Sequence, residues 1–216
     1  AFEYDLAWLE SARPIAIDPT LRLHRGLQYL GADRPNFGVF LDSSPDRWGR
    51  VLLARREGQR AREARRAPRT LFEIDYLLGV YDGHRLGGLR YRVGAGPFLD
   101  DDAELASPPW TSLRELEQAS LALEREDAER DPRYGKWLRM LIAPGRSLGG
   151  ARPKASVVDP DGNLWLAKFP SVEDAEDIGA WESVVHHLAR SAGLDVAPAK
   201  LERFGKKQHT FVVRRF

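Results

Sequence analysis

The chain contains no cysteine, one methionine and almost no net charge among its 216 residues. Without cysteine, disulfide bonds and thiolate metal sites are excluded, and a reducing compartment such as the cytoplasm is indicated. The formal net charge of +1 produces no global field that would attract nucleic acid or a membrane surface. No apolar run approaches the roughly 18 residues of a membrane-spanning helix, and no signal-like segment opens the sequence. We therefore expect a cytoplasmic protein with no membrane partner.

The composition is that of a globular protein, with 43% hydrophobic and 30% charged residues. Its length suffices for one large or two small domains with an ample core. The sequence begins at Ala1 without a methionine and stops at Phe216 inside an apolar, strand-like run. These two features favour a piece of a longer protein.

The first half of the chain has a mixed α and β pattern. "FEYDLAWLE", residues 2–10, alternates as a strand does, and a helix is predicted to begin near Arg47. "TLFEIDYLLGVYDGHRLGGLRYRV", residues 70–93, predicts a helix followed by a strand. The acidic, proline-containing stretch 97–110 is the best candidate for a linker.

The pattern changes at Ser112. Ser112 and Glu115 match a capping box that opens a helix, and residues 136–145 predict a second, short helix. Residues 155–169 predict a β-hairpin, because two alternating runs flank the turn sequence Asp-Pro-Asp-Gly. An amphipathic helix follows over residues 174–193, and its predicted core face comprises Ile178, Trp181, Val185 and Leu188. Two more strand-like runs complete the sequence.

"GRSLGGARPKASVV", residues 145–158, combines glycines with a lysine, a composition that suggests phosphate binding. Gly145 and Gly150 have the spacing of a Walker A loop, but Ala151 and Arg152 follow where that motif requires lysine and serine or threonine. The dinucleotide fingerprint G-x-G-x-x-G is absent. The stretch is thus a glycine-rich loop that leads into a strand.

The order of elements around this loop is that of a protein kinase small lobe. There, a glycine-rich loop covers the phosphates, a strand lysine binds the α- and β-phosphates, and a helix glutamate holds that lysine. Lys168 ends the second strand of the predicted hairpin, and Glu182 lies early on the following helix. Each feature alone is more often a plain loop, a solvated edge charge or a surface carboxylate. Their order together indicates a phosphate site.

The run "SLGGARPKASVV…GNLWLAKFPS…D…WESVVHHLARSAGLDVAPAKL…VVRRF" resembles the HipA family, the serine/threonine kinase toxins of bacterial toxin–antitoxin pairs. "FLDSSPDRWGRVLLARRE" and "DYLLGVYDGHRLGGLRYRV" resemble its N-terminal subdomain. The resemblance spans nearly the whole chain and includes the fairly specific motif S-x-G-G-A-x-P-K. It implies an α+β fold, with an N-terminal α/β subdomain over residues 1–105. A protein-kinase-like small lobe with an antiparallel sheet and a helix would occupy 106–216 and end at the hinge.

The resemblance also implies roles for single residues. Lys168 would bind ATP phosphates with Glu182 as its ion-pair partner, and Ser147 matches a serine that family members autophosphorylate. A phosphate on Ser147 would place about −2 charge where ATP's own phosphates bind, which would eject the loop and silence the kinase. The alternative for Ser147 is a turn serine that bonds its own backbone. The implied ATP-binding residues are Gly149, Gly150, Ala151, Arg152, Pro153, Lys154, Lys168, Arg214, Arg215 and Phe216. Arg214 departs from the acidic residue usual at the first hinge position.

The resemblance places the catalytic aspartate and the Mg²⁺ ligands beyond the hinge. We therefore expect no catalytic and no metal-binding residue in this chain, and no phosphate transfer by it alone. The acids Asp159, Asp161, Asp174 and Asp177 have the context of turns and helix starts.

The function implied for the whole protein is that of an ATP- and Mg²⁺-dependent kinase toxin that phosphorylates a translation component of the aminoacyl-tRNA synthetase type. Its implied partners are the protein substrate and a helix-turn-helix antitoxin of the HipB type, with DNA contacted only through that antitoxin. The alternative is a non-catalytic interaction module that binds an antitoxin or another partner protein.

Three further features have simpler predictions. A basic stripe from Arg50 to Arg69 is expected to be a solvated helix face, with contact to an antitoxin or its DNA as the alternative. His186 and His187 point about 100° apart on a helix, which disfavours a metal site. The six tryptophans are predicted to be core residues.

Overall fold

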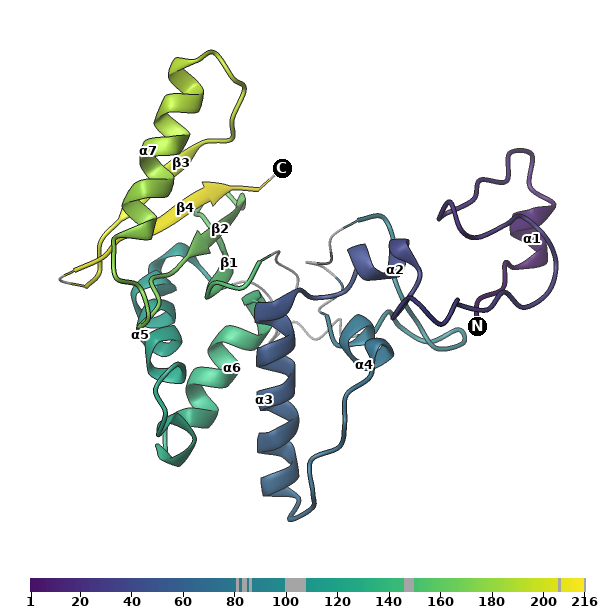
Figure 1. Ribbon diagram of the computed structural model, residues 1–216, viewed down its shortest axis with the longest axis horizontal. Coiled ribbons are helices and arrows are strands. Elements are labelled where there is room, and N and C mark those ends of the chain that lie inside the picture. The colour runs from purple at the N-terminus through teal and green to yellow at the C-terminus, as the bar shows by residue number, and fades with distance from the viewer. Residues whose placement is uncertain are drawn as a thin grey trace.

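A computed structural model describes residues 1–80, 82, 85, 87–99, 108–145, 150–205 and 207–215. The chain is an α+β protein, as predicted, in which helices accompany a four-stranded antiparallel sheet (Figure 1). None of the helices in these ranges is long and apolar enough to cross a bilayer.

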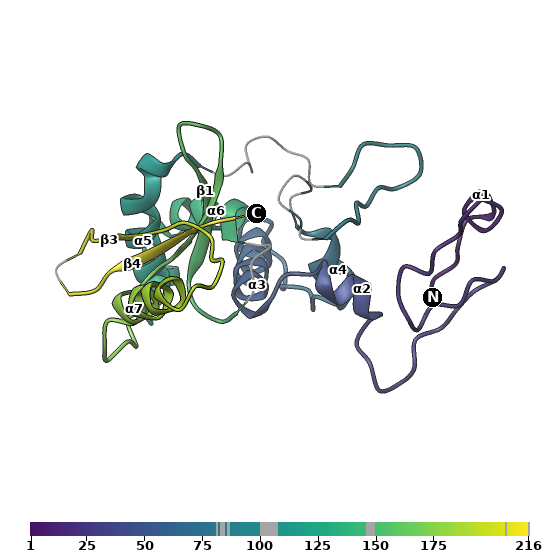
Figure 2. The ribbon, with the colours of Figure 1, turned by 90° about the horizontal axis from the view of Figure 1, so that it is seen from above.

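Helix α1 (Leu6–Leu9) lies at the far end of the molecule from the sheet (Figures 1 and 2). Helices α2 (Gly38–Asp42) and α4 (Glu73–Leu78) lie between α1 and the part that contains the sheet. The strand predicted for residues 2–10 is wrong: Phe2 makes an isolated bridge with Gln28, and the Asp5 carboxylate accepts from the Ala7 amide at 2.8 Å and caps α1. A local side-chain cap has prevailed over a short alternating pattern.

The strand predicted after α4 is likewise absent from the described residues of that segment. Only an isolated antiparallel bridge between Arg92 and Phe98 forms there. Gly87 has a φ of +81°, a left-handed conformation that suits a turn better than an extended ladder.

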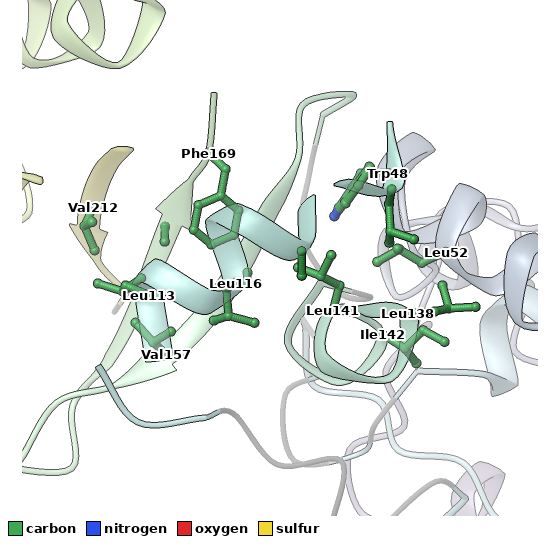
Figure 3. Packing of buried hydrophobic residues seen from close by; sticks show 14 of the residues in the cluster. Trp48, Leu52, Leu113, Leu116, Leu138, Leu141, Ile142, Val157, Phe169 and Val212 are labelled. Carbon is green, nitrogen blue, oxygen red and sulfur yellow. The ribbon is translucent and has the colours of Figure 1, made fainter. Parts of the chain in front are cut away.

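The main core is built by α3 (Arg47–Glu63), α5 (Leu113–Leu123) and α6 (Tyr134–Gly145) together with one face of the sheet (Figure 3). Two short 3₁₀ helices, Trp110–Ser112 and Ala128–Arg130, precede α5 and α6. The capping box at Ser112 is wrong, because Ser112 already has helical dihedrals and its side chain makes no cap bond. Trp48 and Leu52 of α3 pack in the same cluster as Val157 and Phe169, so one core joins both predicted regions.

The sheet has the order β1-β2-β4-β3, from β1 (Lys154–Val158), β2 (Leu164–Lys168), β4 (Thr210–Arg214) and β3 (Ala199–Glu202). The predicted hairpin is confirmed. The Asp159 carboxylate closes its turn by accepting from the amides of Asp161 and Asn163 at 3.0 and 2.8 Å.

The faces of the sheet alternate by residue, as a pleated strand requires. Ala155, Val157, Ala167 and Val212 are buried in the main core with α5 and α6. The residues between them point to the other face, on which α7 (Ile178–Ser191) lies across β3 and β4.

The predicted core face of α7 is wrong for three of its four residues. Trp181 is 57% exposed, and Val185 and Leu188 are exposed as well, whereas Ile178 is half-buried. The helix instead packs through Gly179 against the backbone of His209 and through His186, whose ring centroid lies 5.9 Å from that of Phe211.

The prediction that the tryptophans are core residues holds in part. Trp48 and Trp165 are buried, and Trp110 and Trp137 are partly buried against the main core. Trp8 and Trp181 are exposed.

Candidate nucleotide site

Lys168 and Glu182 form an ion pair on the α7 side of the sheet. The Lys168 Nζ lies 2.5 Å from the Glu182 Oε2, and Nζ also lies 5.7 Å from the Phe211 ring centroid. The side chains are 32% and 27% exposed. The contact between these two residues is therefore present as predicted, and both side chains are partly exposed.

The start of α7 is held on β4 by Asp177 and Gly179, which places Glu182 one turn further on. The Asp177 Oδ1 accepts from the amides of Ala180 at 3.1 Å and His209 at 3.0 Å, and its Oδ2 lies 2.5 Å from the His209 Nδ1. Burial alone would raise the pKa of Asp177, but the hydrogen bonds from His209 and Ala180 hold it below its ordinary value. At Gly179 any Cβ would collide with the His209 carbonyl.

The described end of the glycine-rich loop, residues 150–153, is tied to the rest of the domain by backbone and side-chain bonds. Gly150 has a φ of +93°, which favours glycine. The Arg152 guanidinium makes a bidentate pair with Asp174, at 2.7 and 2.5 Å, and the Pro153 carbonyl accepts from the Phe169 amide at 2.9 Å. Ala151, between them, is exposed. Arg152 is thereby engaged in holding the loop to the segment after β2.

Lys154, the last residue of the predicted nucleotide loop, begins β1 and lies opposite Lys168 in the sheet register. Its side chain is only 3% exposed, and its Nζ lies 3.4 Å from the Asp46 Oδ2. Burial lowers the pKa of Lys154, and Asp46 counteracts that effect. The two lysines thus differ in burial: the Lys168 side chain is partly exposed and the Lys154 side chain is enclosed.

Arg214 and Arg215, the predicted hinge residues, lie at the opposite end of β2 from Lys168. Arg214 pairs with Trp165 in the register, and its Nη2 donates to the Asn163 Oδ1 at 2.5 Å. The Arg215 amide donates to the Leu164 carbonyl at 2.8 Å, and burial lowers the pKa of its guanidinium. Ser147, Gly149 and Phe216 lie outside the described residues.

The four acids considered in the sequence lie in turns and at a helix start. Asp159 closes the hairpin turn, Asp174 binds Arg152, Asp177 caps α7, and Asp161 is exposed in the turn. Across the described ranges, no group of three histidine or acidic side chains is arranged to hold a metal ion.

The basic stripe of α3 is not simply a solvated face. Arg50 makes a bidentate pair with Glu73 at 2.6 Å, and Arg55 donates to the Leu123 carbonyl at 2.6 Å. The Arg66 guanidinium donates to Glu57 at 2.6 Å and, with Arg69, lowers the pKa of that carboxyl to about 2. These arginines tie neighbouring segments to α3.

Comparison with known proteins supplies the family. Residues 146–216 match the family described as HipA-like C-terminal domain. This segment is therefore similar to the HipA-like C-terminal domain. The resemblance of the sequence to the HipA family is therefore confirmed, whereas the expectation that the chain is an N-terminal portion stays a prediction. Searches of curated proteins and of solved structures gave no match.

The matched segment starts within the glycine-rich loop and includes all the residues of the predicted site, among them Lys154, Lys168 and Glu182. The nucleotide-binding roles of these residues, and the division of the chain at residue 105, stay predictions. Asp46 lies outside the matched segment. Its contact with Lys154 was not predicted from the sequence, because the two residues are 108 positions apart. The local sequence indicated for Asp46 only a position just before a helix.

Proposed function

We propose that the HipA-like domain of this chain is the ATP-binding small lobe of a protein serine/threonine kinase of the HipA toxin type. The observation that carries the proposal is the accessible ion pair between Lys168 and Glu182 on a strand and a helix. A carboxylate that holds a lysine ammonium in one orientation prepares it to bind phosphate oxygens, and kinases use this pairing for the α- and β-phosphates. The match of residues 146–216 to the HipA-like C-terminal domain supports the same class.

The chain's own residues have a divided task in this proposal. Lys168 binds phosphate and Glu182 orients it, while the Arg152–Asp174 pair holds the end of the loop. Gly150, without a Cβ, leaves the backbone open to phosphate oxygens. Mg²⁺ would neutralise phosphate charge, and we expect its ligands and the catalytic aspartate in sequence beyond residue 216.

The role of the complete protein is proposed from its similarity to the HipA family. The complete protein would act in the cytoplasm on a translation component such as an aminoacyl-tRNA synthetase. It would be restrained by a HipB-type antitoxin and by autophosphorylation of Ser147. The protein substrate, the antitoxin and, through it, DNA would be its partners.

An interaction module is the second candidate, and one observation favours it. Trp181, Val184, Val185 and Leu188 share a face of α7 and are exposed. Exposed apolar side chains at helical spacing are typical of surfaces that bind another protein. A protein of this kind would not require nucleotide.

Calorimetric titration of the 216-residue chain with ATP and with adenosine separates the two candidates. We expect Lys168→Met to weaken ATP binding by about tenfold or more, the effect of losing one charge-assisted hydrogen bond. Adenosine binding should hardly change in this variant, because in the proposal Lys168 contacts only the phosphates of ATP and adenosine has none. Lys136→Met, at an exposed position of α6, is the matched control and should bind ATP normally. A folded chain that does not bind ATP would favour the interaction module.

Autophosphorylation is tested on the full-length gene product expressed with ATP. Intact-mass and peptide analysis should find one phosphate on Ser147, and the Lys168→Ala variant should lack it. A phosphate that persists in the variant would contradict the assignment of Lys168.

A further inference from the structure

Lys154 is enclosed under the end of the glycine-rich loop and faces Asp46. Its side chain is 3% exposed, whereas that of Asp46 is 20% exposed. A buried ammonium is stable only where a carboxylate or other acceptors replace its water. Asp46 lies 3.4 Å from Nζ, and the burial of the Lys154 side chain separates its ammonium from a ligand in solvent.

Asp46 performs two tasks with its two oxygens. Its Oδ1 accepts from the Gly49 amide at 3.3 Å and so caps α3, while its Oδ2 faces the Lys154 ammonium. A helix N-terminus carries partial positive charge and favours an aspartate side chain as its cap. The cap therefore holds the Asp46 side chain at a defined place beside β1.

Trp48, two residues after Asp46, bonds the same stretch of chain. Its backbone amide donates to the Gly150 carbonyl at 3.4 Å, and its indole Nε1 donates to the Lys154 carbonyl at 3.1 Å. The Trp48 side chain is buried in the main core. The first turn of α3 thus contacts both ends of the segment 150–154.

The Lys154 ammonium also lies next to Gly150. A Cβ on Gly150 would lie 2.9 Å from the Lys154 Nζ. The lysine therefore packs directly against the α-carbon of the last loop glycine. A displacement of the ammonium would therefore change the packing around Gly150.

We propose that Asp46 and Lys154 are positioning residues that fix the end of the glycine-rich loop to the first turn of α3. The two lysines of the site then divide the work: Lys168 binds phosphate, and Lys154 acts through the loop backbone. The expected effect on ATP binding rests on the proposed nucleotide function, but the contact between Asp46 and Lys154 can be tested without nucleotide.

A double-mutant cycle tests the proposal. Asp46→Asn keeps an oxygen that can cap α3 and removes the charge, and Lys154→Met keeps most of the side-chain volume. We expect each to weaken ATP binding by about tenfold, and the double variant to bind no more weakly than either single one, as for residues that act as a unit. Lys154→Arg, which restores the charge, should recover part of the affinity.

The control is Asp5→Asn, which also replaces a capping aspartate, but one that precedes α1, a helix far from β1. It should leave ATP binding unchanged. If Lys154→Met weakens ATP binding while Asp46→Asn does not, Lys154 is a direct phosphate ligand and the proposal is wrong. The same conclusion follows if the two effects add in full.

Hydrogen exchange measures the positioning apart from ATP. In Asp46→Asn we expect faster amide exchange both in the first turn of α3 and in residues 150–154, with α5 unchanged. Unchanged exchange at 150–154 would overturn the proposal. Failure of the wild-type chain to bind ATP, with coupled exchange in the variant, would contradict the proposed function and leave the contact supported.

Discussion

Replacement of Gly179 by alanine tests how closely α7 is docked on the sheet. A Cβ there would lie 2.1 Å from the His209 carbonyl oxygen, whereas real Cβ contacts are essentially never shorter than 3.0 Å. The helix must therefore move away from β4 by about 0.9 Å or more. Overpacking costs about 1–3 kcal/mol, against a gain of about 1 kcal/mol when a helical glycine becomes alanine. Because the clash is with backbone, no rotamer change relieves it. We expect a net loss of up to about 2 kcal/mol.

The same movement carries Glu182 away from Lys168, so Gly179→Ala should also weaken ATP binding. Urea denaturation gives the free energy of unfolding, and calorimetric titration gives the affinity. Gly58→Ala is the matched control, because it is also helical but a Cβ at Gly58 meets nothing within 4 Å. It should stabilise the chain by about 0.5–1 kcal/mol. If Gly179→Ala is as stable as Gly58→Ala, the close helix–strand contact is wrong.

Three further predictions concern stability, each measured by thermal or urea unfolding. Phe169→Ala removes a fully buried core ring and should cost about 3–5 kcal/mol, whereas the exposed Phe72→Ala should cost little; equal losses would contradict the described core. Burial raises the pKa of Glu117 above 4.5, so its carboxylate destabilises the fold as pH rises past that value. Glu117→Gln should therefore raise the melting temperature at pH ~7.5, with a gain that disappears near pH ~4.5; a constant gain would refute this. The pKa of Glu57 is lowered from 4.5 to about 2 by the Arg66 hydrogen bond. Its contribution is present above pH 4.5 and is lost as pH falls to about 2, so Glu57→Gln should destabilise at pH ~7 but not near pH ~2.

The elements that could be predicted from the sequence are those with local causes. The hairpin of β1 and β2 depends on alternation and on a turn in which Asp159 bonds nearby amides. Lys168 and Glu182 are separated by 14 positions, across a strand end and one helix turn, so their contact followed from the order of the elements. The helix α7 was also predicted, because its apolar residues recur at helical spacing.

Features decided by distant contacts could not be predicted. The apolar period of α7 indicated a buried face, but the helix is docked through Gly179 on His209, and its apolar residues point outward. Asp46 and Lys154 are 108 positions apart, and nothing in the sequence around either residue indicates that they are in contact. The strand predicted for residues 2–10 was wrong for a local reason. The Asp5 side chain caps α1, and this hydrogen bond competed with a weak strand pattern.

The most direct test of the nucleotide site is lysine labelling by an acyl-phosphate derivative of ATP, followed by peptide mapping. Such a probe acylates the lysine amine that lies beside its phosphates. We predict that Lys168 is acylated, that excess ATP protects it, and that the enclosed Lys154 is acylated far less. Acylation spread over exposed lysines such as Lys136, with no protection by ATP, would contradict a phosphate site at Lys168.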